Sequence, residues 1–333
     1  MPRNATSEPT APMNVIVPSQ LYADAVNASP YLSAVIVHFK GGAPSATEPD
    51  RVVYPEAGTV PPHTPPARAL LADGYSWDSI EPVVRQVPSL ELVQTLAQGV
   101  DPLRGIPEHI AVSNGRGAHG AATAELGVLL LLALQRRLPD FLAAQAAGRW
   151  EPGPAPKGLA GARVLIVGAG DLAHEFARRV SGFGAVCSLV GRTARDGVHA
   201  TSELPELLPA ADAVVLTVSY NSTTHHLADA AFLSRLRDGA ILVNIARGPV
   251  VDTDALLAEL TAGRLRAGLD VTDPEPLPAG HPLWRAPGVI ITPHAGFVTE
   301  GAGPRGLDVA VAQLEQLAQG RRPDNVVPRA DLV

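Results

Sequence analysis

The chain of 333 residues is poor in cysteine and in clusters of positive charge. Cys187 is the only cysteine, which excludes a disulfide within the chain. A lone thiol is typical of a reducing compartment, so we expect a cytoplasmic protein. No run of five or more lysines and arginines occurs, and the net charge is −7. This charge pattern argues against a nucleic-acid partner.

Long apolar runs are missing as well. The most apolar run, residues 126–134, is much shorter than the roughly 20 residues that a helix needs to cross a bilayer. The first 12 residues lack the apolar segment of a secretory signal peptide, so we expect no membrane association. An apolar content of 46% over this length predicts a globular protein of two domains.

Strand-like and helix-like segments alternate regularly from residue 161 onward. Such alternation predicts βαβ units and a parallel, doubly wound sheet of the α/β class. The expected strands are 163–170, 185–191, 213–218, 240–246, 267–271 and 288–294, and the expected helices are 171–184, 203–211, 229–236 and 254–264.

The rest of the chain has a looser pattern of the same kind. A long helix rich in alanine and leucine is expected at 121–150, apolar around much of its circumference, as in a helix buried between domains or subunits. Pro139 should bend or break it. Further strands are expected at 13–18, 33–39, 68–74, from 91 and at 109–114, helices at 77–87 and 309–320, and proline-rich loops at 56–67 and 151–158.

A glycine-rich segment, GAGDLA at 168–173, follows an expected strand and opens an expected helix. It fits the G-x-G-x-x-G/A pattern of dinucleotide-binding loops. Gly168 permits the tight turn, and Gly170 lets the backbone approach a pyrophosphate. The N–H groups of Asp171 and Leu172 would face that anion. The simpler alternative is a glycine-rich turn that binds no ligand.

The end of the next expected strand indicates which dinucleotide is bound. Sites for NAD usually place an acidic residue here, which binds the ribose 2′-hydroxyl. This chain has Gly191 at that position, followed by Arg192, with Arg195 nearby. A guanidinium suits a 2′-phosphate, so we expect NADP(H) to be preferred, with NAD(H) possible. The alternative is that Arg192 is a solvated loop residue.

Arg247, Glu275 and His294 form the most informative set of polar residues, in the segments NIARGPVVD, LDVTDPEP and ITPHAG. A guanidinium can bind a carboxylate and polarise the neighbouring carbonyl. An imidazole that a carboxylate keeps oriented and charged can donate a proton. The three together suit the reduction of a 2-keto acid. Taken singly, each has a simpler interpretation: a surface arginine, a solvated acid and a structural histidine.

The remaining histidines show no metal-ligand spacing, so we expect no metal site. His225 and His226 are adjacent in the sequence. Their side chains should therefore diverge and face solvent.

The segments quoted above resemble the D-isomer-specific 2-hydroxyacid dehydrogenase family. The resemblance runs through most of the chain but is loose over the first 90 residues. It implies a Rossmann-type cofactor domain, 118–299, inserted into a flavodoxin-like substrate domain of 1–117 and 300–333. It also implies a homodimer joined through the cofactor domains, with the long helix in the interface. The matching stretches are 92–101, 122–150, 159–173, 217–227, 239–260, 267–284, 289–296 and 325–328.

The resemblance assigns roles to individual residues. Arg247 would bind the substrate carboxylate and carbonyl oxygen, and His294, held by Glu275, would be the general acid in reduction and the base in oxidation. Backbone N–H groups at Gln98 and Gly99 would also hold the substrate carboxylate. Asp270 would orient the nicotinamide carboxamide. The expected cofactor-binding residues are Gly168, Gly170, Asp171, Leu172, Arg192, Thr193, Ala246 and Asp270.

Within the family, a glyoxylate/hydroxypyruvate reductase is favoured, because a preference for NADP(H) accompanies reductive use. A phosphoglycerate or phosphite dehydrogenase-like member is an alternative. Formate dehydrogenase-like chemistry is disfavoured, because those members have glutamine where this chain has Glu275. An alternative of another class is a dinucleotide-sensing protein similar to transcriptional co-repressors, which would act through protein partners rather than by catalysis.

Overall fold

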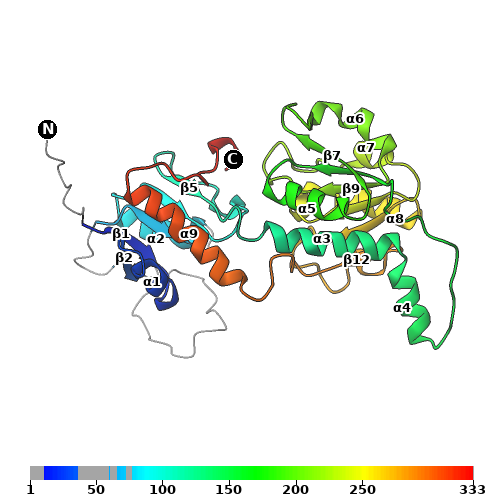
Figure 1. Ribbon diagram of the computed structural model, residues 1–333, viewed down its shortest axis with the longest axis horizontal. Helices are drawn as coiled ribbons and strands as arrows, with labels where there is room; N and C mark the ends of the chain where they lie inside the picture. Colours follow the sequence, from blue (N-terminus) through cyan, green and yellow to red (C-terminus); the bar gives the residue numbers. More distant parts are fainter. Residues whose placement is uncertain (1–10, 37–59, 61–65, 73–76, 333) are drawn as a thin grey trace, which may run out of the picture. The chain divides into compact units, whose positions relative to one another are not determined.

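The computed structural model describes residues 11–36, 60, 66–72 and 77–332 (Figure 1). The ends of two expected strands, 37–39 and 73–74, and most of the expected loop at 56–67 lie outside these ranges. The chain divides into two compact units. One comprises Met1–His119 and Glu300–Val333, and the other, Gly120–Thr299, is inserted between these two segments.

The first unit contains a five-stranded parallel sheet in the order β2-β1-β3-β4-β5. This is the flavodoxin-like strand order, which confirms the fold class expected for this part of the chain. The strands are β1 (Met13–Val17), β2 (Leu32–Ile36), β3 (Ala69–Leu71), β4 (Leu92–Gln94) and β5 (Ala111–Ser113), and the helices are α1 (Gln20–Asn27), α2 (Trp77–Gln86) and α9 (Ala302–Ala318).

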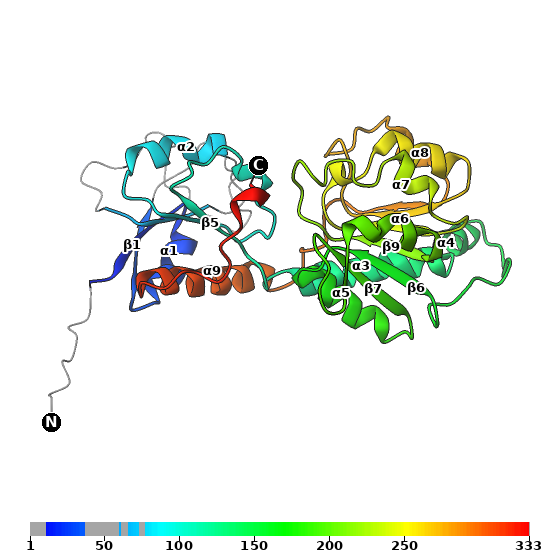
Figure 2. The ribbon, with the colours of Figure 1, turned by 90° about the horizontal axis from the view of Figure 1, so that it is seen from above.

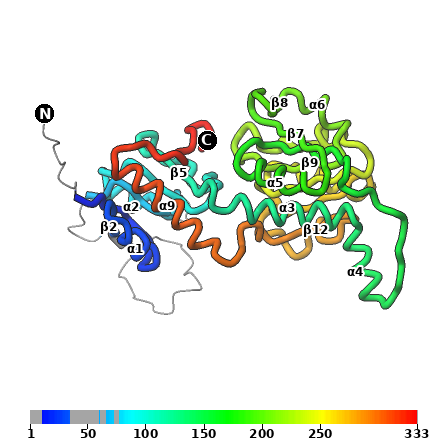
Figure 3. Tube along the Cα trace, in the orientation of Figure 1, coloured from blue at the N-terminus to red at the C-terminus, as the bar shows by residue number. Residues whose placement is uncertain are grey.

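Helices cover both faces of this sheet. Alternate strand residues point to opposite faces, so each strand contributes to two apolar clusters. Val15 and Val17 pack in the apolar cluster of α1 and α9, whereas Ile16 packs in that of α2. After α9 the chain returns to β5, where Val326 pairs with Ser113 (Figure 3). Both chain segments therefore contribute to the first unit, and the C-terminal one pairs with its edge strand.

Two helices of this unit differ from the expectation. Helix α1 falls where no helix is expected, and α9 begins at Ala302 rather than at 309. Gly303, Pro304 and Gly306 occupy its first turns, and such poor helix formers conceal a helix start in a sequence. A proline is tolerated in the first turn because its missing N–H would have no partner within the helix there.

The second unit contains a seven-stranded parallel sheet in the order β12-β11-β10-β9-β6-β7-β8 (Figure 2). This confirms the doubly wound parallel sheet, although β8 is not expected from the sequence. Its strands are β6 (Arg163–Val167), β7 (Val186–Gly191), β8 (Val198–Ala200), β9 (Ala213–Leu216), β10 (Ile241–Asn244), β11 (Arg266–Leu269) and β12 (Val289–Ile291). Its helices are α3 (Gly120–Gln135), α4 (Leu138–Ala146), α5 (Asp171–Ser181), α6 (Leu204–Leu207), α7 (Ala230–Ser234) and α8 (Thr253–Thr261).

Helices cover both faces of this sheet. One apolar cluster joins α3 and α5 to the sheet and includes the fully buried Phe176. The other includes residues of α7 and α8. Helix α3 lies so close to the sheet that a Cβ atom on Gly127 would be 2.8 Å from Ile245 Cδ1. A glycine at this position therefore allows the close packing.

The expected long helix is two helices. It breaks at Arg136 and Arg137, and Arg137 has the left-handed φ of 59°. Pro139 lies in the first turn of α4, where proline fits, so the break comes just before it rather than at it. In the part of the chain that is described, no helix has both the length and the apolarity to cross a membrane.

Candidate active site

The candidate residues of the second unit gather at one end of its sheet. All seven strands are parallel, so the loops that follow them leave from the same end. The order of the strands reverses between β6 and β9, and such a switch point is where open α/β sheets bind ligands. The glycine loop follows β6, and Arg247, Glu275 and His294 follow β10, β11 and β12.

The glycine loop has the backbone that a dinucleotide site requires. Gly168 has φ 128°, and a Cβ atom there would be 2.2 Å from Thr217 Oγ1. Gly170 precedes α5 and has no atom within 4 Å of an added Cβ, so its backbone is open to a ligand. Asp171 and Leu172 open α5, where helix N–H groups have no partner within the helix. These residues fit the pyrophosphate of a dinucleotide.

The segment after β7 places an arginine, Arg195, against the glycine loop. Arg195 donates from Nη2 to the backbone oxygen of Ala169 at 3.1 Å. Its Nη1 lies 3.1 Å from the place of a Cβ on Gly191. Arg192 and Thr193 are exposed beside it. The sequence points first to Arg192, whereas the structure places the Arg195 guanidinium directly against the loop.

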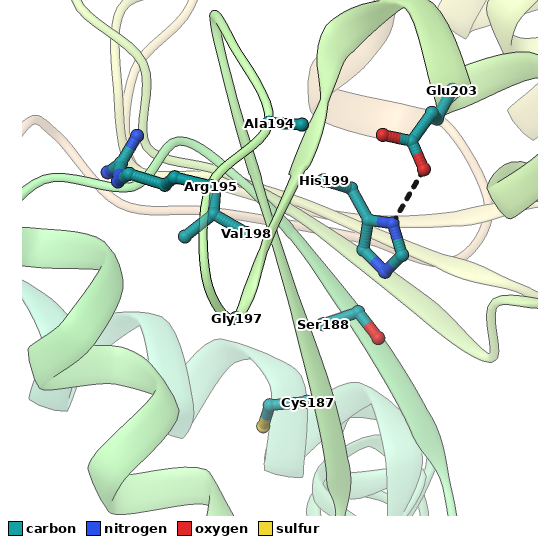
Figure 4. A pocket seen from close by; sticks show the side chains of 8 residues that line it. All are labelled: Cys187, Ser188, Ala194, Arg195, Gly197, Val198, His199 and Glu203. Carbon is teal, nitrogen blue, oxygen red and sulfur yellow. Dashed lines mark hydrogen bonds and ion pairs between the residues drawn. The ribbon is translucent and has the colours of Figure 1, made fainter.

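Arg195 also lines a hollow of about 430 Å³ beside β7 and β8 (Figure 4). The hollow holds an ion pair between His199 Nδ1 and Glu203 Oε2, 2.8 Å apart. Both groups are on the outer strands and the turn that follows them, whereas the three candidate catalytic residues follow β10, β11 and β12. The His199–Glu203 pair therefore serves as an internal comparison for the pair formed by His294.

His294 and Glu275 form a hydrogen-bonded pair. Nδ1 of His294 lies 2.7 Å from Glu275 Oε1, which leaves Nε2 for a substrate. The hydrogen bond to His294 is the main cause that lowers the pKa of Glu275. Partial burial opposes this shift, and the positive charge of Arg247 adds to it. The structure therefore brings all three predicted catalytic residues together.

Asp270 builds the turn that carries His294. The residue is 2% exposed, and its side chain accepts hydrogen bonds from Thr292 Oγ1 at 2.6 Å and from the backbone N–H groups of Ala295 and Gly296 at 2.8 and 2.9 Å. The backbone of His294, at the left-handed φ of 52°, donates to the Asp270 carbonyl oxygen at 2.7 Å. These bonds hold a conformation that costs energy for a residue other than glycine. The expected contact of Asp270 with nicotinamide stays a prediction.

Asn244 fixes the loop of Arg247, a role that the sequence does not predict. Fully buried at the end of β10, it donates to the backbone oxygen of Arg247 at 2.9 Å and accepts from the N–H of Ala246 at 3.1 Å. Its signal in the sequence is a polar residue that ends an apolar strand. Gly248 then lets this loop touch the loop of Glu275, because a Cβ there would be 1.9 Å from the backbone oxygen of Thr272.

Two further predictions have mixed outcomes. Gln98 and Gly99 follow β4 in the first unit, where Asn114 Nδ2 donates to the backbone oxygen of Gln98 at 2.8 Å, and their contact with a substrate stays a prediction. The expectation that His225 and His226 diverge is wrong. Their rings stack with centroids 4.0 Å apart, because His226 adopts a left-handed φ of 49°.

Metal ligands have a characteristic arrangement of three or more side chains around one point. Among the described residues, no group of three or more histidine, cysteine, aspartate and glutamate side chains is arranged to hold a metal ion.

The lowered pKa of Glu275 makes part of the stability depend on pH. Its pKa in the folded chain lies below the ordinary 4.5, so ionised Glu275 stabilises the fold fully above that pH and loses this effect as the pH falls through the folded pKa. Glu275→Gln should lower the free energy of unfolding at pH 7, and the difference from wild type should shrink below about pH 4.5. Urea unfolding across this range measures it. Glu108→Gln, at an exposed glutamate of the first unit, is the control and should leave the free energy of unfolding almost unchanged; a difference for Glu275→Gln that grows towards low pH would contradict the assignment.

Comparison with known proteins agrees with this geometry. Residues 128–296 match the NAD-binding domain of the D-isomer specific 2-hydroxyacid dehydrogenases. A human glyoxylate reductase/hydroxypyruvate reductase is 34% identical over 229 residues, which cover 63% of this chain and 69% of the relative. A glyoxylate reductase of Thermococcus litoralis is 31% identical over 292 residues, 80% of this chain and 88% of the relative.

A solved structure covers almost the whole chain. It is a D-isomer specific 2-hydroxyacid dehydrogenase from Xanthobacter autotrophicus Py2 in complex with NADPH and MES. The TM-score is 0.80 at 28% identity, over 97% of this chain and all of the other. The chain therefore belongs to the D-isomer-specific 2-hydroxyacid dehydrogenase family and is an NAD(P)-dependent oxidoreductase, with its NAD-binding domain in residues 128–296.

Proposed function

We propose that this oxidoreductase uses NADPH to reduce a small 2-keto acid to the 2-hydroxy acid, of D configuration where C2 is a stereocentre, with glyoxylate and hydroxypyruvate as the favoured substrates. The observation that carries the proposal is the 2.7 Å pair of His294 and Glu275 beside Arg247, at the same end of the sheet as the glycine loop. The curated relatives named glyoxylate reductase support the choice of substrate.

Each side chain has a defined task in this reaction. Arg247 binds the substrate carboxylate and polarises the adjacent carbonyl. His294 donates the proton on Nε2 to the carbonyl oxygen, and Glu275 on Nδ1 keeps the ring oriented. A bound nicotinamide dinucleotide supplies the hydride that adds to C2. Hydride and proton together convert the carbonyl group to the alcohol, and the reverse reaction uses His294 as base.

The preference for NADPH rests on the end of β7. Gly191 leaves no carboxylate to bind a ribose 2′-hydroxyl or to repel a 2′-phosphate. Arg192, Thr193 and Arg195 offer two guanidinium groups and a hydroxyl at this point, and Arg195 is already bound to the glycine loop. A 2′-phosphate accepts hydrogen bonds from guanidinium groups in pairs.

Turnover of a panel of 2-keto acids tests the proposed reaction. Wild type should oxidise NADPH with glyoxylate and hydroxypyruvate, and His294→Ala should lower kcat at least about 100-fold, as expected for loss of a general acid, while NADPH still binds. NADPH absorbance measures turnover, and fluorescence titration measures binding. His199→Ala is the matched control, because it removes a histidine from a similar pair, and it should keep full turnover. No oxidation of NADPH with any of the keto acids would contradict the proposal and favour a dinucleotide sensor or phosphite oxidation.

The cofactor preference has its own test. Arg192→Ala should raise the Michaelis constant for NADPH far more than that for NADH, because NADH lacks the 2′-phosphate. Removing Arg195 as well should add to the effect, by roughly tenfold for each guanidinium that no longer binds the phosphate. Steady-state kinetics with both cofactors measures the ratio. Equal changes for the two cofactors would contradict the assignment, and Arg178→Ala on the exposed face of α5 is a control.

We also propose a homodimer that buries α4. Leu138, Phe141 and Leu142 on this helix are 41%, 37% and 54% exposed, and Leu129 on α3 is 54% exposed. Large apolar side chains gathered in this way indicate a protein–protein interface. Light scattering should give about twice the chain mass of 34.6 kDa, and Leu142→Glu should shift it towards the monomer. A monomeric wild type at micromolar concentration would contradict the proposal.

A further inference from the structure

Phe297 is a large aromatic residue beside the proton donor. It lies three residues after His294, and the two rings are perpendicular with centroids 5.8 Å apart. This edge-to-face arrangement is a favourable one for aromatic rings. Phe297 is nevertheless 44% exposed, so part of its apolar surface is open to solvent.

The backbone holds Phe297 in this place. Asp270 binds the N–H groups of Ala295 and Gly296, which immediately precede it. A Cβ atom on Gly296 would be 2.9 Å from Asp270 Oδ2 and 3.0 Å from Thr123 Cγ2, so this backbone packs tightly against α3. The ring therefore belongs to the same rigid turn as His294.

The size of a 2-keto acid sets how far it would extend from His294. A carbonyl oxygen that takes a proton from Nε2 lies about 3 Å from that nitrogen. The first atom of the substituent on C2 is only two bonds farther away. Arg247 takes the carboxylate on one side of the carbonyl, which leaves the substituent on the other side. The centroid of the Phe297 ring lies 5.8 Å from that of His294, a distance comparable to the one between Nε2 and this substituent.

We propose that Phe297 determines specificity by forming an apolar wall for the C2 substituent of the substrate. The wall favours 2-keto acids with an uncharged substituent, including hydroxymethyl, and disfavours those that carry a carboxylate or a phosphate there. This inference rests on the proposed function. It separates the favoured substrates from phosphorylated hydroxy acids, which the family resemblance leaves open.

The physical basis is desolvation. A methylene group that moves from water against an aromatic ring gains roughly fourfold in binding. A charged group at the same place loses its hydration shell and gains no partner from a hydrocarbon ring. Glyoxylate carries only hydrogen at this point, so its reduction should be almost insensitive to Phe297 and provides an internal reference.

The experiment compares kcat/KM for glyoxylate, pyruvate, 2-oxobutanoate and oxaloacetate in the full-length enzyme with NADPH. In wild type, kcat/KM should rise about fourfold from pyruvate to 2-oxobutanoate, and oxaloacetate, in which a carboxylate replaces the terminal methyl, should be disfavoured. Phe297→Ala should abolish the rise in kcat/KM from pyruvate to 2-oxobutanoate. It should change kcat/KM for glyoxylate by no more than about twofold. Phe297→Arg should raise kcat/KM for oxaloacetate relative to that for 2-oxobutanoate.

Phe183→Ala is the matched control. This phenylalanine is 47% exposed in the turn between α5 and β7, at the opposite end of the strands. It should leave every ratio unchanged. NADPH binding shows that each variant is folded, and Phe297→Leu, which should retain part of the rise, replaces Phe297→Ala if the latter fails to bind.

Two failures can be told apart. If wild type reduces glyoxylate but the ratios are the same in Phe297→Ala, the inference about Phe297 is wrong and the proposed function stands. If wild type reduces no 2-keto acid, the proposed function fails and the inference fails with it.

Discussion

The geometry of the site depends on one buried carboxylate. Asp270 ends the β11 segment, is 2% exposed, and binds three donors that all belong to the turn after β12. A buried charge is stable only when such partners replace the water that it has lost. In return, the turn is tied to the neighbouring strand end, and His294 is held at a positive φ with Nδ1 towards Glu275. The His294 ring and the adjacent Phe297 ring take their positions from this one group.

Close backbone contacts bring the other loops of the site together. Gly168 fits against Thr217, and Gly248 fits against Thr272, at distances that exclude any Cβ atom. The first contact joins the glycine loop to the segment after β9, and the second joins the loop of Arg247 to that of Glu275. The parallel strands place these loops at one end of the sheet, and the two glycines, which have no side chain, allow the loops to contact each other.

The sequence predicts the sheets, the glycine loop and the three polar residues, because apolar periodicity and spaced motifs depend on local order along the chain. It fails where tertiary contacts override local preference. Helix α9 starts early because packing compensates for Gly303 and Gly306, and the His225–His226 stack requires a positive φ that no local pattern reveals. Asn244 and Arg195 act through hydrogen bonds to backbone atoms, and residue type alone does not show those partners.

The contact of Arg195 with Gly191 constrains how this protein could change over evolutionary time. The guanidinium lies 3.1 Å from the place of a Cβ at position 191, while it donates to the backbone oxygen of Ala169. The two positions are therefore coupled: a side chain introduced at 191 requires the Arg195 guanidinium to move, so the effects of substitutions at 191 and 195 should not be additive.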